Sequence, residues 1–211
     1  MNIFTRFLAV VASVSALIFS SAAFAQEAPD ALVKRISDEV LTIAKADKDI
    51  QSGNVNRIVA LVQEKIVPYV DSDRMTALAA GRFWRQATPE QQQQLATQFR
   101  TLLIYTYAGA LSQVRDQKIE YKPLRADPND TEVEVRTQLV QSRGDPIQLS
   151  YRMEKVSSGW KMYDINVMGA WLVDAYKGTF SNEISKGGID GLIKTLTDKN
   201  AQLAARSAAK K

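Results

Sequence analysis

Four strand-like segments follow one another in residues 117–167, which read QKIEYKPLRADPNDTEVEVRTQLVQSRGDPIQLSYRMEKVSSGWKMYDINV. In residues 132–139 and 147–154, apolar and polar side chains alternate with a period of two, the pattern of a strand with one apolar and one wetted face. Turn residues separate the segments at 127–130 (DPND), 143–146 (RGDP) and 157–159 (SSG). Because connections this short join antiparallel neighbours, we expect a four-stranded antiparallel meander with one apolar side.

Amphipathic helices are expected before this sheet. Residues 29–49 and 55–66 carry apolar side chains at helical spacing, and Asn54 is placed to cap the second helix. The motif Thr88-Pro89-Glu90-Gln91 predicts a capping box at the start of a long helix that ends near Arg115. This helix offers the longest apolar surface to lie across the meander.

Shorter helical segments are expected after the sheet. Gly178 separates residues 170–176 from residues 180–184, and Gly187-Gly188 precede a last amphipathic helix. No large apolar residue follows Leu203, so we expect residues 201–211 to form a flexible basic tail. The sequence therefore predicts a single α+β domain over residues 26–200, with about six to seven helices covering the meander.

The first 25 residues have the features of a secretory signal peptide. Arg6 supplies a positive charge, residues 8–19 form a short apolar region, and Ala23-Phe24-Ala25 fits a cleavage site before Gln26. A retained N-terminal anchor is the alternative, but the apolar region is short for a membrane span, which favours the signal peptide. Cleavage would leave 186 of the 211 residues. We therefore expect an exported mature chain.

The composition excludes several classes of catalytic and metal site. The chain contains no histidine and no cysteine. Catalysis by Ser-His-Asp or Cys-His groups and zinc sites built from His or Cys are therefore impossible. The net charge of +4 comes from interspersed residues rather than a basic stripe, so we expect no nucleic-acid partner.

The remaining candidates for chemistry are carboxylates. Asp71 and Asp73 form a D-x-D motif, which fits a helix cap better than a metal site. Asp164 falls inside the fourth predicted strand, between Tyr163 and Ile165. Because no partner base is visible, Asp164 is interpreted as a structural carboxylate. An acid or base role is the alternative.

The sheet and the helices together offer a large amount of facing apolar surface. This surface either forms a filled core or encloses an apolar ligand. Periodicity alone does not separate these two possibilities.

Several short motifs occur in an order and spacing that resemble a known family. Residues 84–91 read WRQATPEQ, residues 105–111 read YTYAGAL, residues 160–164 read WKMYD, and residues 186–192 read KGGIDGL. Together with the signal peptide and Gly169, they resemble the MlaC family, also called the toluene-tolerance auxiliary component. The chain departs from the family at residues 168–171, which read MGAW where the family often has EGVS. Trp171 could therefore reshape the mouth of a pocket.

The resemblance implies a soluble carrier in the periplasm of a Gram-negative cell. The implied ligand is a glycerophospholipid, phosphatidylethanolamine or phosphatidylglycerol, and no cofactor or metal is implied. The implied partners are the outer-membrane lipoprotein–porin complex and the inner-membrane ABC transporter complex with its MCE-domain subunit. A monomer and an NTF2-like outline of the fold are expected.

If the chain is a lipid carrier, the acyl chains should lie in an apolar cavity between the inner sheet face and the long helix. The expected wall consists of Phe99, Leu102, Leu103, Thr106, Val133, Val135, Leu139, Leu149, Tyr151, Met153 and Met162. Residues nearer the mouth are expected to be Val167, Ala170, Leu172 and Tyr176.

Two alternatives remain at this point. One is an exported enzyme on an NTF2-like scaffold that uses Asp164 as an acid or base. The other is a periplasmic adaptor with a filled core, which acts only through its surface.

Overall fold

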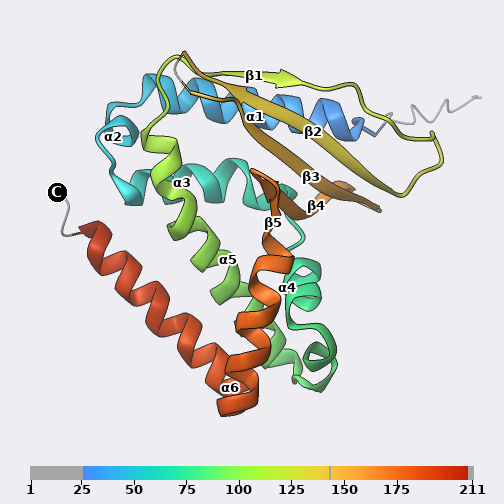
Figure 1. The fold of residues 1–211 in the computed structure, drawn as a ribbon, viewed down its shortest axis with the longest axis vertical. Coiled ribbons are helices and arrows are strands. Elements are labelled where there is room, and N and C mark those ends of the chain that lie inside the picture. The colour runs from blue at the N-terminus through green and yellow to red at the C-terminus, as the bar shows by residue number, and fades with distance from the viewer. Residues whose placement is uncertain (1–25, 143, 209–211) are drawn as a thin grey trace, which may run out of the picture.

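The sheet is a five-stranded antiparallel meander in which neighbours in sequence are neighbours in space (Figure 1). The computed structural model describes residues 26–142 and 144–208, so the expected signal peptide at residues 1–25 lies outside the described residues. The strands are β1 (Lys118–Tyr121), β2 (Glu132–Val140), β3 (Ile147–Val156), β4 (Gly159–Val167) and β5 (Ala170–Trp171). The four expected strands are confirmed, and β5 adds a short fifth strand beside β4.

A β-bulge between β3 and β4 changes which residues of β4 face inward. The register shifts between Arg152 and Met153, so that Met153 pairs with Met162 whereas Tyr151 pairs with Ile165. Met162 and Ile165 therefore face the same side of the sheet although they are three residues apart. Simple alternation along β4 does not predict this arrangement.

Helix α1 (Pro29–Ala46) packs against β1 and β2. Helices α2 (Lys48–Gln51) and α3 (Val55–Lys65) pack against α1 and α5, and the 3-10 turn η1 (Val67–Tyr69) follows α3. The helix expected over residues 29–49 is divided in two, because the Asp47 side chain accepts the backbone N–H groups of Asp49 and Ile50 and so begins α2. The expected cap of α3 is confirmed, since Asn54 accepts the N–H of Arg57 at 3.2 Å.

The remaining helices form the lower half of the molecule in Figure 1: α4 (Ser72–Ala80), the 3-10 segment η2 (Gly81–Gln86), α5 (Pro89–Ser112) and α6 (Leu172–Ala208). The capping box at Thr88 and Gln91 is confirmed at the start of α5. At Gly188 the backbone of α6 is not helical, with φ 67°, and the helix folds back on itself there (Figure 1). The expected break at Gly187-Gly188 is thereby confirmed.

Two expectations for the C-terminal part of the chain differ from the structure. Gly178 does not end a helix but lies inside the first arm of α6, where buried Phe180 anchors the following turn. The second arm continues to Ala208, into the stretch expected to be a flexible tail, and Leu203 packs against the helices there. None of the described helices combines the length and apolarity needed to cross a bilayer.

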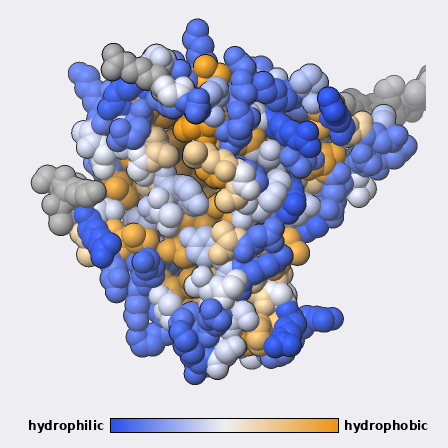
Figure 2. All heavy atoms as spheres, viewed as in Figure 1, coloured by the Kyte–Doolittle hydropathy of each residue, from blue (hydrophilic) through white to orange (hydrophobic). Residues whose placement is uncertain are grey.

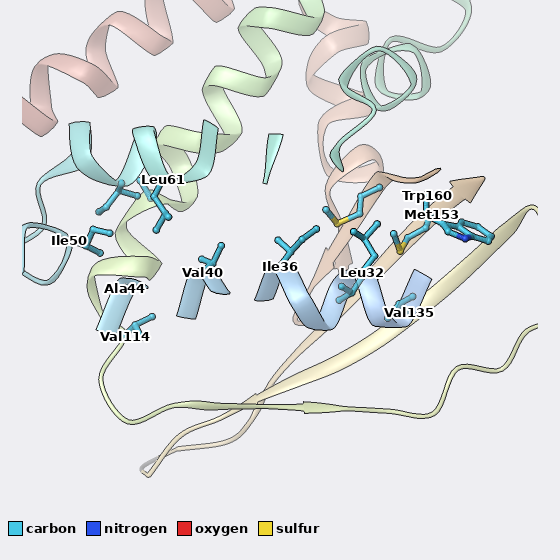
Figure 3. Close-up of a cluster of buried hydrophobic side chains, with 14 residues drawn as sticks. Leu32, Ile36, Val40, Ala44, Ile50, Leu61, Val114, Val135, Met153 and Trp160 are labelled. Carbon is cyan, nitrogen blue, oxygen red and sulfur yellow. The ribbon is translucent and has the colours of Figure 1, made fainter. Parts of the chain in front are cut away.

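The buried side chains form two separate clusters. The sheet core joins α1, α2 and α3 to the sheet, and Figure 3 shows Leu32, Ile36, Val40 and Ala44 in a row along α1, with Val135 and Met153 near one end and Ile50 and Leu61 near the other. The helical core joins α4, α5 and α6 around Leu95, Phe99, Phe180 and Leu192. Helix α5 runs through both, so it spans the space between the two cores.

Arg74 ties α4 to the sheet through a network of charged and aromatic groups. Its guanidinium donates to Glu132 at 2.6 Å and to Glu154, and it lies 3.7 Å over the Tyr163 ring. The Tyr163 hydroxyl donates to the other oxygen of Glu132 at 2.9 Å. Glu132 and Glu154 are direct cross-strand partners, an arrangement that is destabilising for like charges unless a cation lies between them.

Arg74→Met is therefore expected to lower the free energy of unfolding at pH 7 by about 2 kcal/mol, the usual size of a hydrogen bond between charged groups. The hydrogen bond from Arg74 lowers the pKa of Glu132 from its ordinary value of 4.5. A carboxylate with a depressed pKa stabilises the fold above its unfolded-state pKa and loses this contribution as the pH falls through its folded-state pKa. The difference between wild type and variant should thus be complete near pH 7 and shrink below about pH 4.5.

Urea unfolding at pH 7 and at pH 3.5 to 4 measures this difference. Arg85→Met is the control, because Arg85 is an exposed arginine of η2. A difference between wild type and Arg74→Met that stays constant over this pH range would contradict the assigned role of Glu132.

Candidate functional site

An apolar cavity of about 390 Å³ lies between the two cores. Its floor comes from α3, η1 and α4, one wall comes from α5, and the opposite wall comes from the ends of β2, β3 and β4. The lining residues are Val62, Ile66, Val67, Val70, Ser72, Met75, Thr76, Phe99, Arg100, Leu103, Ile104, Tyr107, Ala108, Ala110, Leu111, Leu139, Ile147, Leu149, Ile165, Val167, Met168 and Leu172. Nearly all of them are apolar, so the cavity suits a hydrocarbon rather than a polar ligand.

The cavity opens between α5 and the turn that joins β4 to β5. Among its lining residues, Tyr107 is 39% exposed and Met168 is 74% exposed. Apolar side chains surround a hollow in the upper part of the face shown in Figure 2. An exposed apolar rim of this kind marks a ligand-binding or interaction site.

Met168 is held at this mouth by an unusual backbone conformation. Its φ is 53°, and Gly169 follows with φ 91°. Positive φ is uncommon for residues with a side chain and costs about 1–2 kcal/mol. The turn is fixed by two hydrogen bonds, from the Met168 N–H to the Gln148 carbonyl and from the Gly169 N–H to the Asn166 side chain. Such local strain is characteristic of functional positions.

Six of the residues expected from the sequence line this cavity. They are Phe99, Leu103, Leu139, Leu149, Val167 and Leu172. They come from α5, from the three central strands and from the start of α6, which the structure brings together around one space. The expectation of facing sheet and helix surfaces thus agrees with the cavity at this end of the sheet.

The other nine expected residues do not line it. Val135, Met153 and Met162 are buried in the sheet core, with Val133 and Tyr151 packed against it. Leu102 belongs to the helical core, with Tyr176 packed against it, while Thr106 and Ala170 are exposed. The sheet face is therefore divided: α1 fills the space over one half, and only the other half borders the cavity.

Several lining residues were not expected from the sequence. Ile147 lies two positions before Leu149 in β3, so strand alternation could have placed it on the same face. Ile104 and Tyr107 of α5 follow a helical spacing that could also have been recognised. Val62 of α3 and Ile66 at its C-cap belong to the apolar face expected over residues 55–66, but which part of that face borders a cavity depends on packing between helices.

Asp164 does not line the cavity, and its side chain holds the start of α6. The carboxylate is 1% exposed, and one of its oxygens accepts the N–H groups of Ile165 and Val173 at 2.9 and 3.1 Å. Its other oxygen accepts from Arg152 at 3.2 Å, and the Arg152 guanidinium lies 3.8 Å over the Trp171 ring. Burial raises the pKa of Asp164, and these contacts favour the structural interpretation over the acid–base one.

Trp171 is thus placed on Arg152 rather than in the cavity lining. The D-x-D motif is also accounted for, because Asp71 caps α4 by accepting the N–H of Arg74 at 2.7 Å. Within residues 26–142 and 144–208, no group of three or more Asp, Glu, His or Cys side chains could hold a metal ion.

Comparisons with known proteins agree with the resemblance noted in the sequence. The family model described as "MlaC protein" matches residues 34–198. The chain is 23% identical, over 89% of each chain, to the intermembrane phospholipid transport system binding protein MlaC of Haemophilus influenzae. It is 26% identical to the toluene tolerance protein ttg2D of Pseudomonas putida, over 79% of this chain and 77% of that protein.

A solved structure is similar over most of the fold. It is the phospholipid-binding protein from Ralstonia solanacearum in complex with a phospholipid, with a TM-score of 0.79 and 51% identity over 83% of this chain and 98% of the other. The order of motifs, the family match and this similarity of fold lead to one conclusion. The chain belongs to the MlaC family.

Proposed function

We propose that this chain is a periplasmic carrier that encloses the acyl chains of a glycerophospholipid in the cavity between α5 and the sheet. The observation that carries the proposal is an apolar cavity that opens to the surface. It occurs in a chain 51% identical to a protein solved with a bound phospholipid.

The energetics of lipid transfer explain why such a carrier needs a cavity of this kind. Exposing acyl chains to water costs about 0.8 kcal/mol per CH₂, so some 30 such groups cost on the order of 24 kcal/mol. An apolar lining removes this cost, whereas the hydrated headgroup remains in contact with water at the surface. The carrier therefore requires apolar walls and no catalytic group, and the lining of this cavity meets that requirement.

The position of the mouth supports the same function. Tyr107 and Met168 present apolar surface at the rim. A lipid that leaves a membrane complex can slide over this rim without crossing a polar barrier. We propose that the donor and acceptor complexes are the outer-membrane lipoprotein–porin complex and the inner-membrane ABC transporter with its MCE-domain subunit.

The cargo is proposed to be phosphatidylethanolamine or phosphatidylglycerol, carried by a monomer. The periplasmic location rests on the signal-peptide features of residues 1–25. Family membership supports the transport role, because the Haemophilus relative is named as the binding protein of an intermembrane phospholipid transport system.

The first test is native mass spectrometry of the mature protein purified from a bacterial periplasm, combined with organic extraction. A mass increment equal to a whole number of phospholipids, stoichiometric and stable through gel filtration, is expected. Extraction then identifies the headgroup. Protein that carries no lipid, and that also takes up none from phospholipid vesicles, would contradict the proposal.

A further inference from the structure

Arg100 is the only charged residue among those that line the cavity in the described part of the chain. It is half-buried on α5, one turn before Leu103 and Ile104 and two turns before Tyr107. These four residues follow helical spacing, so they share one face of α5. The side chain of Arg100 therefore leaves α5 on the same face as the apolar wall, to which it contributes its aliphatic part.

The guanidinium of Arg100 has no hydrogen-bond or ion-pair partner within residues 26–142 and 144–208, unlike other half-buried arginines of this protein. Arg74 pairs with Glu132 and Glu154, and Arg152 pairs with Asp164. A cation beside an apolar surface is costly unless it is paired or reaches water. Arg100 is partly exposed, so its charged head reaches water beside the cavity and is open to an external anion.

The chemistry of the guanidinium identifies the class of anion. Its planar fork of five N–H donors matches the oxygens of a phosphate, to which it donates two parallel hydrogen bonds. The aliphatic stem of an arginine can lie along apolar lining while its head reaches the boundary with water. A phospholipid divides in the same way, with apolar chains inside and a phosphodiester at the interface.

We propose that Arg100 binds the phosphate of the enclosed lipid and thereby makes the cavity selective for phospholipids over neutral lipids with the same acyl chains. The inference rests on the proposed carrier function and adds a specific polar contact to it. Because the phosphodiester is common to phosphatidylethanolamine and phosphatidylglycerol, this contact does not distinguish between these two headgroups.

A competition between two lipids tests the proposal. The protein, freed of co-purified lipid, is mixed with vesicles that contain phosphatidylglycerol and diacylglycerol with identical acyl chains. The bound lipids are then counted by mass spectrometry after gel filtration. Wild type should retain phosphatidylglycerol at least tenfold better than diacylglycerol, the size expected from a charge-assisted hydrogen bond.

Arg100→Met keeps an unbranched apolar stem and removes the charge. The variant should lose most of the tenfold preference because phosphatidylglycerol retention falls, while diacylglycerol retention stays unchanged. Arg100→Lys, which keeps the charge but not the planar fork, should give an intermediate preference. Arg85→Met, outside the cavity lining, is the matched control and should behave as wild type.

The outcomes separate this proposal from the carrier function itself. An Arg100→Met protein that is folded by circular dichroism and keeps the wild-type preference would overturn the role of Arg100 and leave the carrier function intact. A wild-type protein that takes up both lipids equally would also overturn it. If wild type retained neither lipid, this result would contradict both the carrier function and the role of Arg100.

Discussion

Leu149→Glu is expected to abolish phospholipid retention while the protein remains folded. Leu149 lies in β3, in the half of the sheet that borders the cavity, and is only partly buried. A carboxylate there can keep its water while the cavity is empty. An acyl chain bound there would displace the water around the carboxylate, and the desolvation free energy of one ion is effectively several kcal/mol. Because each 1.4 kcal/mol changes affinity tenfold, retention should fall by a factor of 100 or more.

The adjacent position offers a matched control. Gln148 precedes Leu149 in the same strand, is exposed, and points to the opposite face of the sheet. Gln148→Glu adds the same charge to the same strand and should retain lipid as wild type does. Both variants are purified from the periplasm, checked by circular dichroism and compared by the lipid-to-protein ratio after gel filtration. Normal retention by folded Leu149→Glu would show that acyl chains do not pass this part of the sheet.

The features that were predictable from sequence are those that depend on local signals. Strand alternation and turn residues predict β1 to β4, and the T-x-x-Q motif at residues 88–91 predicts the start of α5. Each of these signals operates between residues that are close in sequence. They fix where an element begins and which of its faces is apolar.

The exact position of the cavity depends on which elements cover each part of the apolar face. Tyr151 and Leu149 both follow the inward alternation of β3. Tyr151 packs against the sheet core beneath α1, whereas Leu149 lines the cavity. No local signal distinguishes the two, because the difference arises from where α1 and α5 lie over the sheet. The residues predicted for the cavity wall are therefore divided between core and cavity.

Two further differences also come from tertiary packing. Gly178 lowers helix propensity by about 1 kcal/mol relative to alanine, yet the helix continues through it. The reason is Phe180, two positions further along the helix, which is fully buried and stabilises the helical turn that contains Gly178. The bulge in β4 likewise depends on how β4 pairs with β3, and alternation within one strand does not reveal this register.

Phe180→Ala is expected to have the largest effect on stability. The side chain is fully buried in the helical core, with its ring 4.9 Å from that of Phe99 and 6.0 Å from that of Tyr176, both in edge-to-face geometry. Truncating a buried phenylalanine costs about 3–5 kcal/mol, because the apolar transfer energy is lost and a void remains. The edge-to-face pairs add about 0.5–1.5 kcal/mol each to what is lost. Phe180→Leu, which leaves a smaller void, should cost less.

The comparison with Leu149→Glu tests whether the helical core and the cavity act independently. Phe180 is not among the residues that line the cavity, although its neighbour Phe99 is. Phe180→Ala should therefore lower the urea midpoint strongly while the folded protein, measured well below that midpoint, still retains phospholipid. Leu149→Glu should do the reverse. If Phe180→Ala lost its lipid while folded, the helical core would have to be part of the binding site, with Phe99 transmitting its packing to the cavity wall.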